Sequence, residues 1–217
     1  MAVGPPPDTT SLEKIVEAME DKRRALGVER WVIWGMSGGS FLGQIYAGTY
    51  PDAVRGLILV SSGPYFRQTV EDPECILCPQ NKAWFAKLSE QTLLAGDYDQ
   101  GSTTWDRIEG VGWVFRRAKG AALLVSPEEP NAELQRIMPA LWAFDARPWL
   151  PALRSPTLVM CGTADPVVPL RHAQALANLL PNARLVAIEN AGHIPLADNR
   201  PAVEHAIRTF LSELPSG

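Results

Sequence analysis

A serine flanked by glycines is the residue of this chain best suited to chemistry. Residues 35–39 read GMSGG, which matches the pattern G-x-S-x-G. A short apolar run at 31–35 precedes the serine, and a helix rich in small residues is expected to start near Gly38. A tight turn between a strand and a helix strains the backbone and lifts the serine hydroxyl clear of the sheet. The pattern therefore predicts a nucleophile at Ser37. The alternatives are a glycine-rich turn without chemistry and a phosphate-binding loop, whose lysine the pattern lacks.

A serine hydroxyl is a weak nucleophile, so it needs a base and a group that orients the base. His193 lies in a loop just after the last expected strand, and Asp165 directly follows the preceding strand. Loops at the carboxyl ends of parallel strands share one edge of the sheet, and Ser37 is expected at that edge. The chain order serine, aspartate, histidine is also the order found with this motif. Taken alone, His193 reads as a structural loop histidine and Asp165 as a turn residue before proline. Together with Ser37 they predict a catalytic triad.

Four other polar residues are weaker candidates. His172 and His205 fall on expected helices, where a packed or solvated histidine is the better interpretation. Asp198 lies near the start of the final helix and is interpreted as a capping residue. Asp145 is interpreted as a structural ion-pair partner in the middle of the chain. None of the four is expected to be catalytic.

The cysteines do not indicate a disulfide framework, because there are three of them. Cys75 and Cys78 are spaced C-x-x-C, but a structural zinc site needs four ligands and the sequence has no second C-x-x-C and no H-x-x-x-H. We therefore expect these two residues to be packing residues or free thiols. Cys161 follows an apolar run and is expected in the core. No metal and no other cofactor is expected.

Composition narrows the class of protein. The formal net charge is −4, whereas nucleic-acid binders usually carry a basic face. No apolar run approaches the length of a membrane span. The first residues lack the basic and apolar regions of a secretory signal. We therefore expect a cytoplasmic protein that binds neither nucleic acid nor membrane.

Strand and helix patterns alternate at both ends of the chain. This alternation predicts a parallel α/β sheet with right-handed crossovers. The expected strands, buried where the run is uniformly apolar, are 31–35, 54–61, 157–162 and 184–188. The expected helices are one that begins at Thr10 and is capped at Gly27, two at 38–49 and 170–180, and one that opens at Pro201.

The middle of the chain differs from its two ends. Helical patterns are expected at 80–95, 103–124 and 130–144, and no strand signal interrupts them. We therefore expect an α/β core made of residues 1–63 and 150–217, with a helical cap inserted at 64–149.

Taken together, these features of the sequence resemble the α/β-hydrolase superfamily. The matching segments are 32–62, 156–169 and 185–211, and within the superfamily they are similar to the esterase, lactonase and proline-iminopeptidase-like branch. The resemblance implies a mainly parallel sheet flanked by helices, with a helical cap. It also implies that Ser37, Asp165 and His193 form the triad, and that the backbone N–H of Gly38 is one donor to the oxyanion.

One departure from the family accompanies this resemblance. Members carry several strands before the first helix expected here, with a His-Gly loop that supplies a second oxyanion donor. Only about ten residues precede that helix, so we expect a truncated form of the fold. Strand 31–35 would then lie at a sheet edge, and an exposed apolar edge favours pairing with another chain. We therefore expect a homodimer or an aggregation-prone protein joined along 31–35.

The function expected from the triad is hydrolysis of a small carboxylic ester or lactone through an acyl-enzyme. The same triad also suits an aminopeptidase-like or a carbon–carbon bond hydrolase, since specificity depends on the cap. Dehalogenase chemistry is disfavoured, because that branch carries an aspartate where Ser37 stands. A non-catalytic binding protein on a truncated hydrolase scaffold is the alternative from another class.

Overall fold

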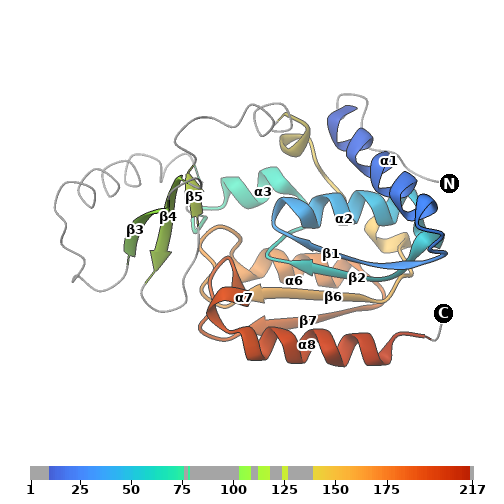
Figure 1. Cartoon of the computed structure of the whole chain (residues 1–217). Coiled ribbons are helices and arrows are strands. Elements are labelled where there is room, and N and C mark those ends of the chain that lie inside the picture. Colours follow the sequence, from blue (N-terminus) through green and yellow to red (C-terminus); the bar gives the residue numbers. More distant parts are fainter. Residues whose placement is uncertain are drawn as a thin grey trace.

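The computed structural model describes residues 10–75, 78, 103–108, 112–117, 124–126 and 139–215. Its main feature is a four-stranded parallel sheet in the order β1-β2-β6-β7 (Figure 1). This sheet confirms the parallel α/β arrangement predicted from the alternation of strands and helices. Its strands are β1 (Trp31–Met36), β2 (Val54–Val60), β6 (Thr157–Gly162) and β7 (Ala183–Ile188).

Helices cover both faces of the main sheet (Figure 1). Helices α1, α2 and α6 pack on one face, and α8 packs on the other. No helix in the described part of the chain is both long enough and apolar enough to cross a bilayer. The helices are α1 (Thr10–Ala25), α2 (Gly38–Thr49), α3 (Phe66–Glu71), α6 (Leu170–Leu179), α7 (Pro195–Asp198) and α8 (Arg200–Glu213), with 3₁₀ turns at Pro51–Ala53 and Leu150–Ala152.

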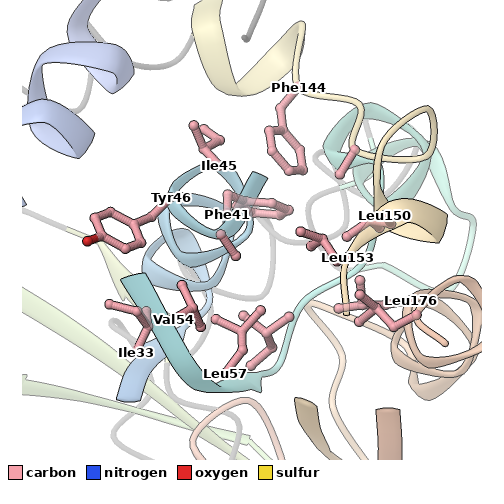
Figure 2. Packing of buried hydrophobic residues seen from close by; sticks show 14 of the residues in the cluster. Ile33, Phe41, Ile45, Tyr46, Val54, Leu57, Phe144, Leu150, Leu153 and Leu176 are labelled. Atoms are coloured by element: carbon pink, nitrogen blue, oxygen red, sulfur yellow. The ribbon is translucent and has the colours of Figure 1, made fainter. Parts of the chain in front are cut away.

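Alternating side chains of the central strands contribute to two hydrophobic cores. In β2, Leu57 and Leu59 belong to the core under α2, whereas Ile58 and Val60 belong to the core under α8. Figure 2 shows the first core, where Phe41 of α2 lies near residues from β2 and from the 140–153 segment. Burial on both faces is the usual environment of a parallel strand. The two cores thus fix β2 and β6 at the centre of the sheet.

Strand β1 lies at one edge of the described sheet. Its Ile33 is buried, but Trp34 is 50% exposed. The expectation that all of 31–35 is buried on both faces is therefore wrong at Trp34. The physical reason is the position of Trp34 on the edge strand. The buried strand residues under α8 come from β2, β6 and β7, and none comes from β1.

The middle of the chain contains strands where we expected a helix. Strands β3 (Thr103–Ile108), β4 (Gly112–Arg117) and β5 (Leu124–Ser126) form an antiparallel sheet in the order β3-β4-β5. The prediction of a helix over 103–124 is wrong, because threonine, valine, tryptophan and phenylalanine in this stretch favour strands. Of the other expected cap helices, residues 139–142 are helical, and 80–95 lies outside the described residues.

The two ends of the expected insertion pair with each other. Tyr65 forms an antiparallel bridge with Asp145, and the Ala146 N–H donates to the Pro64 carbonyl at 2.8 Å. Asp145 binds Arg147 in an ion pair at 2.6 Å, and the Arg147 guanidinium lies 4.3 Å from the centre of the Tyr65 ring. The interpretation of Asp145 as an ion-pair partner is thus confirmed, and its contacts join the entry and exit of this segment.

A buried glutamate attaches helix α1 to helix α2. Glu20 is 3% exposed, and its carboxylate accepts hydrogen bonds from Arg23, Arg24 and the Tyr46 hydroxyl at 2.7–2.8 Å. The hydrogen bonds from Arg23, which outweigh the effect of burial, lower the pKa of Glu20 to about 2. Burial and the Glu20 charge raise the pKa of Tyr46 to about 12.

We predict that Glu20→Gln lowers the free energy of unfolding at neutral pH by about 1–3 kcal/mol, since a charged buried acceptor is lost. Because the folded pKa is lowered, the stabilisation is complete above the unfolded value of 4.5 and is lost as the pH falls toward about 2. Urea unfolding of both proteins at neutral pH and between these two values measures this. Glu17→Gln, at an exposed position of the same helix, is the control. A stability difference that stays constant with pH would contradict the assignment.

The homodimer expected along strand 31–35 stays a prediction. Within the described residues, β1 pairs with a strand on one side only, and Trp34 is exposed on it. Light scattering at micromolar concentrations is expected to give a mass above that of one chain, and Trp34→Lys is expected to lower it, because charge on an edge strand opposes pairing. A wild-type protein that is monomeric at every concentration would contradict the prediction.

Candidate active site

The nucleophile candidate lies in a strained turn between β1 and α2. Ser37 has φ 51° and ψ −118°, and its N–H donates to the Val60 carbonyl at 2.8 Å. Positive φ is costly for a residue other than glycine and persists only where the surroundings enforce it. A Cβ at Gly35 would lie 2.3 Å from the Gly39 carbonyl oxygen, so only glycine fits there. This is the geometry that the G-x-S-x-G pattern predicted.

A buried hydroxyl one turn further along α2 holds this turn together. The Ser40 hydroxyl lies 2.8 Å from the Gly35 carbonyl and 3.0 Å from the Val60 carbonyl, and it accepts the Val60 N–H at 3.0 Å. It therefore joins the start of α2 to both β1 and β2. Ser40 is not predicted from the sequence. A serine within a run of small and apolar residues is only weak evidence for a buried hydroxyl that supports a turn.

The acid candidate is held in place by the loop that follows it. Asp165 comes three residues after β6, and its Oδ1 accepts the N–H groups of Val167 and Val168, each at 2.9 Å. Its side chain is fully buried. Hydrogen bonds from two N–H groups satisfy a carboxylate that burial would otherwise penalise. Asp165 is therefore a fixed acceptor.

The base candidate meets this acceptor. His193 Nδ1 lies 3.0 Å from Asp165 Oδ2 and 3.2 Å from Asp165 Oδ1, and the His193 side chain is 8% exposed. The two loops approach each other closely, since a Cβ at Gly162 would lie 2.2 Å from the Ala191 carbonyl oxygen. The Ala164 N–H donates to that same carbonyl at 2.9 Å. The structure thus brings together Asp165 and His193, which lie far apart in the sequence.

The third member and the oxyanion candidate lie at the same edge of the sheet. Ser37 follows the carboxyl end of β1, as Asp165 follows β6 and His193 follows β7 (Figure 1). Ser37 is partly exposed and Gly38, the first residue of α2, is exposed. Among the described residues, no hydrogen bond joins the Ser37 hydroxyl to His193. The complete triad and the role of Gly38 therefore stay predictions.

A second buried histidine–aspartate pair lies beside the acid loop. His172 Nε2 is 2.6 Å from Asp72 Oδ2, and both side chains are buried. Arg171 also binds Asp72, and it reaches Glu74 at 2.5 Å. Burial would raise the pKa of Asp72, but the hydrogen bonds from Arg171, the Glu74 N–H and His172 lower it to about 2. His172 is thus a packed histidine, as expected, in a cluster that attaches the start of the inserted segment to α6.

The remaining candidates have structural positions. His205 is exposed on α8, in agreement with a solvated histidine. The interpretation of Asp198 as a helix cap is wrong: Asn199 caps α8 by accepting the Ala202 N–H, and Asp198 instead accepts the Gly192 N–H at 2.8 Å. The difference arises because the short helix α7, which the sequence analysis did not predict, brings Asp198 back toward the histidine loop.

The three cysteines are buried, and none of them forms a disulfide bond. The Cys75 thiol contacts the Val167 carbonyl at 3.0 Å, and the Cys78 thiol contacts the Glu71 carbonyl at 3.5 Å. The prediction that these two are packing residues or free thiols is confirmed. Cys161 lies in the core as expected, 3.8 Å from Asp165 Oδ2, and burial together with the nearby Asp165 charge raises the pKa of its thiol.

A comparison with protein families agrees with this fold. The sequence model of the alpha/beta hydrolase fold family matches residues 4–102 and 127–200. Because these residues make up more than half of the chain, the chain belongs to the alpha/beta hydrolase fold family. The resemblance recognised from the sequence is confirmed.

Individual relatives are similar in sequence over different parts of the chain. A pimeloyl-[acyl-carrier protein] methyl ester esterase of Xanthomonas oryzae pv. oryzae is 27% identical over 189 residues, 85% of this chain and 71% of that protein. The polyketide synthase ThaQ of Burkholderia thailandensis is 49% identical over 74 residues, which are 34% of this chain and only 4% of that protein.

Solved structures show the same fold at low sequence identity. An alpha/beta fold family hydrolase from Bacillus anthracis has a TM-score of 0.69 and 18% identity, over 92% of this chain and 73% of that chain. A structure described as an N-acyl homoserine lactone degrading enzyme has a TM-score of 0.60 and 21% identity, over 92% of this chain and 74% of that chain.

We predict that Ser40→Ala lowers the free energy of unfolding by about 1–3 kcal/mol, because a buried Val60 N–H loses its partner. The measurement is urea unfolding. Ser212→Ala is the matched control: its exposed hydroxyl contacts only the Thr209 carbonyl one turn earlier in α8, and it should change stability by at most about 0.5 kcal/mol. Equal stability of the two variants would contradict a supporting role for Ser40.

Proposed function

We propose that this chain is a serine hydrolase that cleaves small carboxylic esters or lactones through an acyl-enzyme. The observation that carries the proposal is the buried Asp165–His193 pair at 3.0 Å, at the sheet edge where the strained Ser37 turn lies. A buried imidazole bonded to a buried carboxylate has a fixed orientation, which a general base requires. The turn at the same sheet edge carries the partly exposed Ser37, whose hydroxyl is the group on which this base acts in the proposal.

Each group has one role in the proposed reaction. His193 Nδ1 donates to Asp165, which leaves Nε2 free to take the Ser37 proton as Oγ attacks the substrate carbonyl. The backbone N–H of Gly38, at the N-terminus of the 12-residue helix α2, stabilises the negative charge on the carbonyl oxygen. His193 returns the proton to the leaving alcohol, and a water molecule then hydrolyses the acyl-Ser37 ester by the same route. No cofactor takes part.

The proposed substrate class is supported by the substrates that appear in the names of similar proteins. The Xanthomonas protein is named as a methyl ester esterase, and a similar solved structure as a lactone-degrading enzyme. A relative of Pseudomonas syringae, 37% identical over 94 residues, is named as a putative carbamate hydrolase. All three substrates have an acyl carbon that a serine can attack. A small ester-like molecule is therefore the substrate we propose, while peptide or carbon–carbon bond cleavage by the same triad is the alternative.

The proposal predicts that Ser37→Ala lowers the hydrolysis rate of short p-nitrophenyl esters by at least about 10³-fold, since the covalent route is removed. The wild-type protein should also release a burst of p-nitrophenol equal to the amount of enzyme, because an acyl-enzyme accumulates. The exposed Ser212→Ala serves as the control variant.

Two outcomes would count against the proposal. Equal rates for the wild type and Ser37→Ala would remove Ser37 from the mechanism. Absence of both burst and turnover in the wild type, with a range of acyl chain lengths and lactones, would favour the non-catalytic binding protein.

A further inference from the structure

One peptide group in the loop that carries His193 is hydrogen-bonded at both its carbonyl and its N–H. The peptide between Ala191 and Gly192 has its carbonyl bonded to the Ala164 N–H at 2.9 Å and its N–H bonded to Asp198 Oδ2 at 2.8 Å. Both ends of this peptide plane are therefore fixed from outside the loop. Only Gly192 separates this plane from His193, so the orientation of the plane helps to set where the imidazole begins.

We propose that Asp198 is a positioning residue that holds His193 against Asp165. The inference rests on the proposed function, because it concerns the same base. Gly192 has the widest backbone freedom of any residue type, so the direction of the chain into His193 must be imposed by its neighbours. Asp165 fixes the far side of the ring, and Asp198 fixes the backbone from which the ring extends.

The chain between Gly192 and Asp198 closes into a compact ring. The N–H groups of Ala197 and Asp198 bond to the Ile194 carbonyl at 2.9 and 3.3 Å, which turns the chain back after His193. Asn199 Nδ2 then donates to the Glu189 carbonyl at 3.3 Å, at the end of β7. The loop is thus held to the end of β7 by the Asn199 bond, and its two halves are held together by the bond between Gly192 and Asp198.

A carboxylate is well suited to this position. Asp198 lies two residues before the 14-residue helix α8, whose N-terminus favours a negative charge. An ionised acceptor makes a shorter and stronger bond with an N–H than a neutral one. The Gly192 N–H is buried, so removal of its acceptor leaves a donor unsatisfied and allows the peptide to rotate.

The test compares Asp198→Ala, which removes the acceptor, with Asp198→Asn, which keeps an oxygen at the same place. Asp198→Ala is expected to slow acylation by p-nitrophenyl acetate by about 10–100-fold with little change in KM, since a misplaced base affects the chemical step. Asp198→Asn is expected to recover most of that rate. Asp52→Ala, an exposed aspartate at the opposite end of β2, is the control and should match the wild type.

A second readout does not depend on catalysis. The proton on His193 Nδ1, bonded to Asp165, should give a separate downfield ¹H NMR signal in the wild type and in Asp198→Asn. In Asp198→Ala this signal should broaden or vanish while circular dichroism shows a folded protein. If the alanine variant does not fold, Asp198→Leu, which fills the space of the carboxylate without an acceptor, is read in the same way.

The outcomes separate this inference from the proposed function. A sharp downfield signal and an unchanged acylation rate in a folded Asp198→Ala or Asp198→Leu variant would overturn the positioning role. Loss of the signal in Asp198→Asn would overturn it as well, because that variant keeps the acceptor. If Ser37→Ala hydrolyses esters as fast as the wild type, the proposed function fails, whereas the NMR signal still tests Asp198.

Discussion

An acid and a base on two separate loops can pair only if the loops approach at van der Waals distance. In this chain the approach is allowed by Gly162, where a Cβ would lie 2.2 Å from the Ala191 carbonyl oxygen. The acid loop then bonds to the base loop through the Ala164 N–H, and Asp165 meets His193 at 3.0 Å. The order of the strands and the two cores both position the loops for this one contact. Without the Asp165–His193 contact, no hydrogen bond would join the acid to the base at this sheet edge.

Strain in the nucleophile turn is compensated by the structure around it. Ser37 adopts a positive φ that only a well-determined environment maintains. That environment is a glycine at 35 that admits the backbone of Gly39, and a buried Ser40 hydroxyl bonded to both β1 and β2. Below them, the core residues of α2 and β2 fix the helix on the sheet (Figure 2). Packing in the core thus stabilises Ser37 in a backbone conformation that would otherwise be unfavourable.

Much of this arrangement could be predicted from the sequence, and the failures have physical causes. Uniformly apolar runs and the glycine pattern located the sheet, the Ser37 turn and the loops of Asp165 and His193, because these signals are local. Asp198 was assigned as a cap because a carboxylate before a helix usually is one. Its actual partner, the Gly192 N–H, depends on the turn formed by α7, which has no strong sequence signal. Ser40 was missed for a similar reason, since its partners lie on two strands.

The error in the middle of the chain has a different origin. A helical period over 103–124 predicts a helix, but the β-branched and aromatic residues of this stretch favour strands, and β3 and β4 form there. Short apolar stretches fit both periods, and pairing with neighbouring strands decides between them. The residues of the core were less ambiguous because glycine turns and prolines bounded each element there.

The central claim is that Ser37 is activated by the Asp165–His193 pair. The most direct measurement is peptide mapping by mass spectrometry after reaction with a fluorophosphonate, which captures only an activated serine. The account predicts a single covalent adduct on the peptide that contains Ser37, and its loss in His193→Ala. An unmodified protein, or an adduct on Ser37 that forms equally fast without His193, would contradict it.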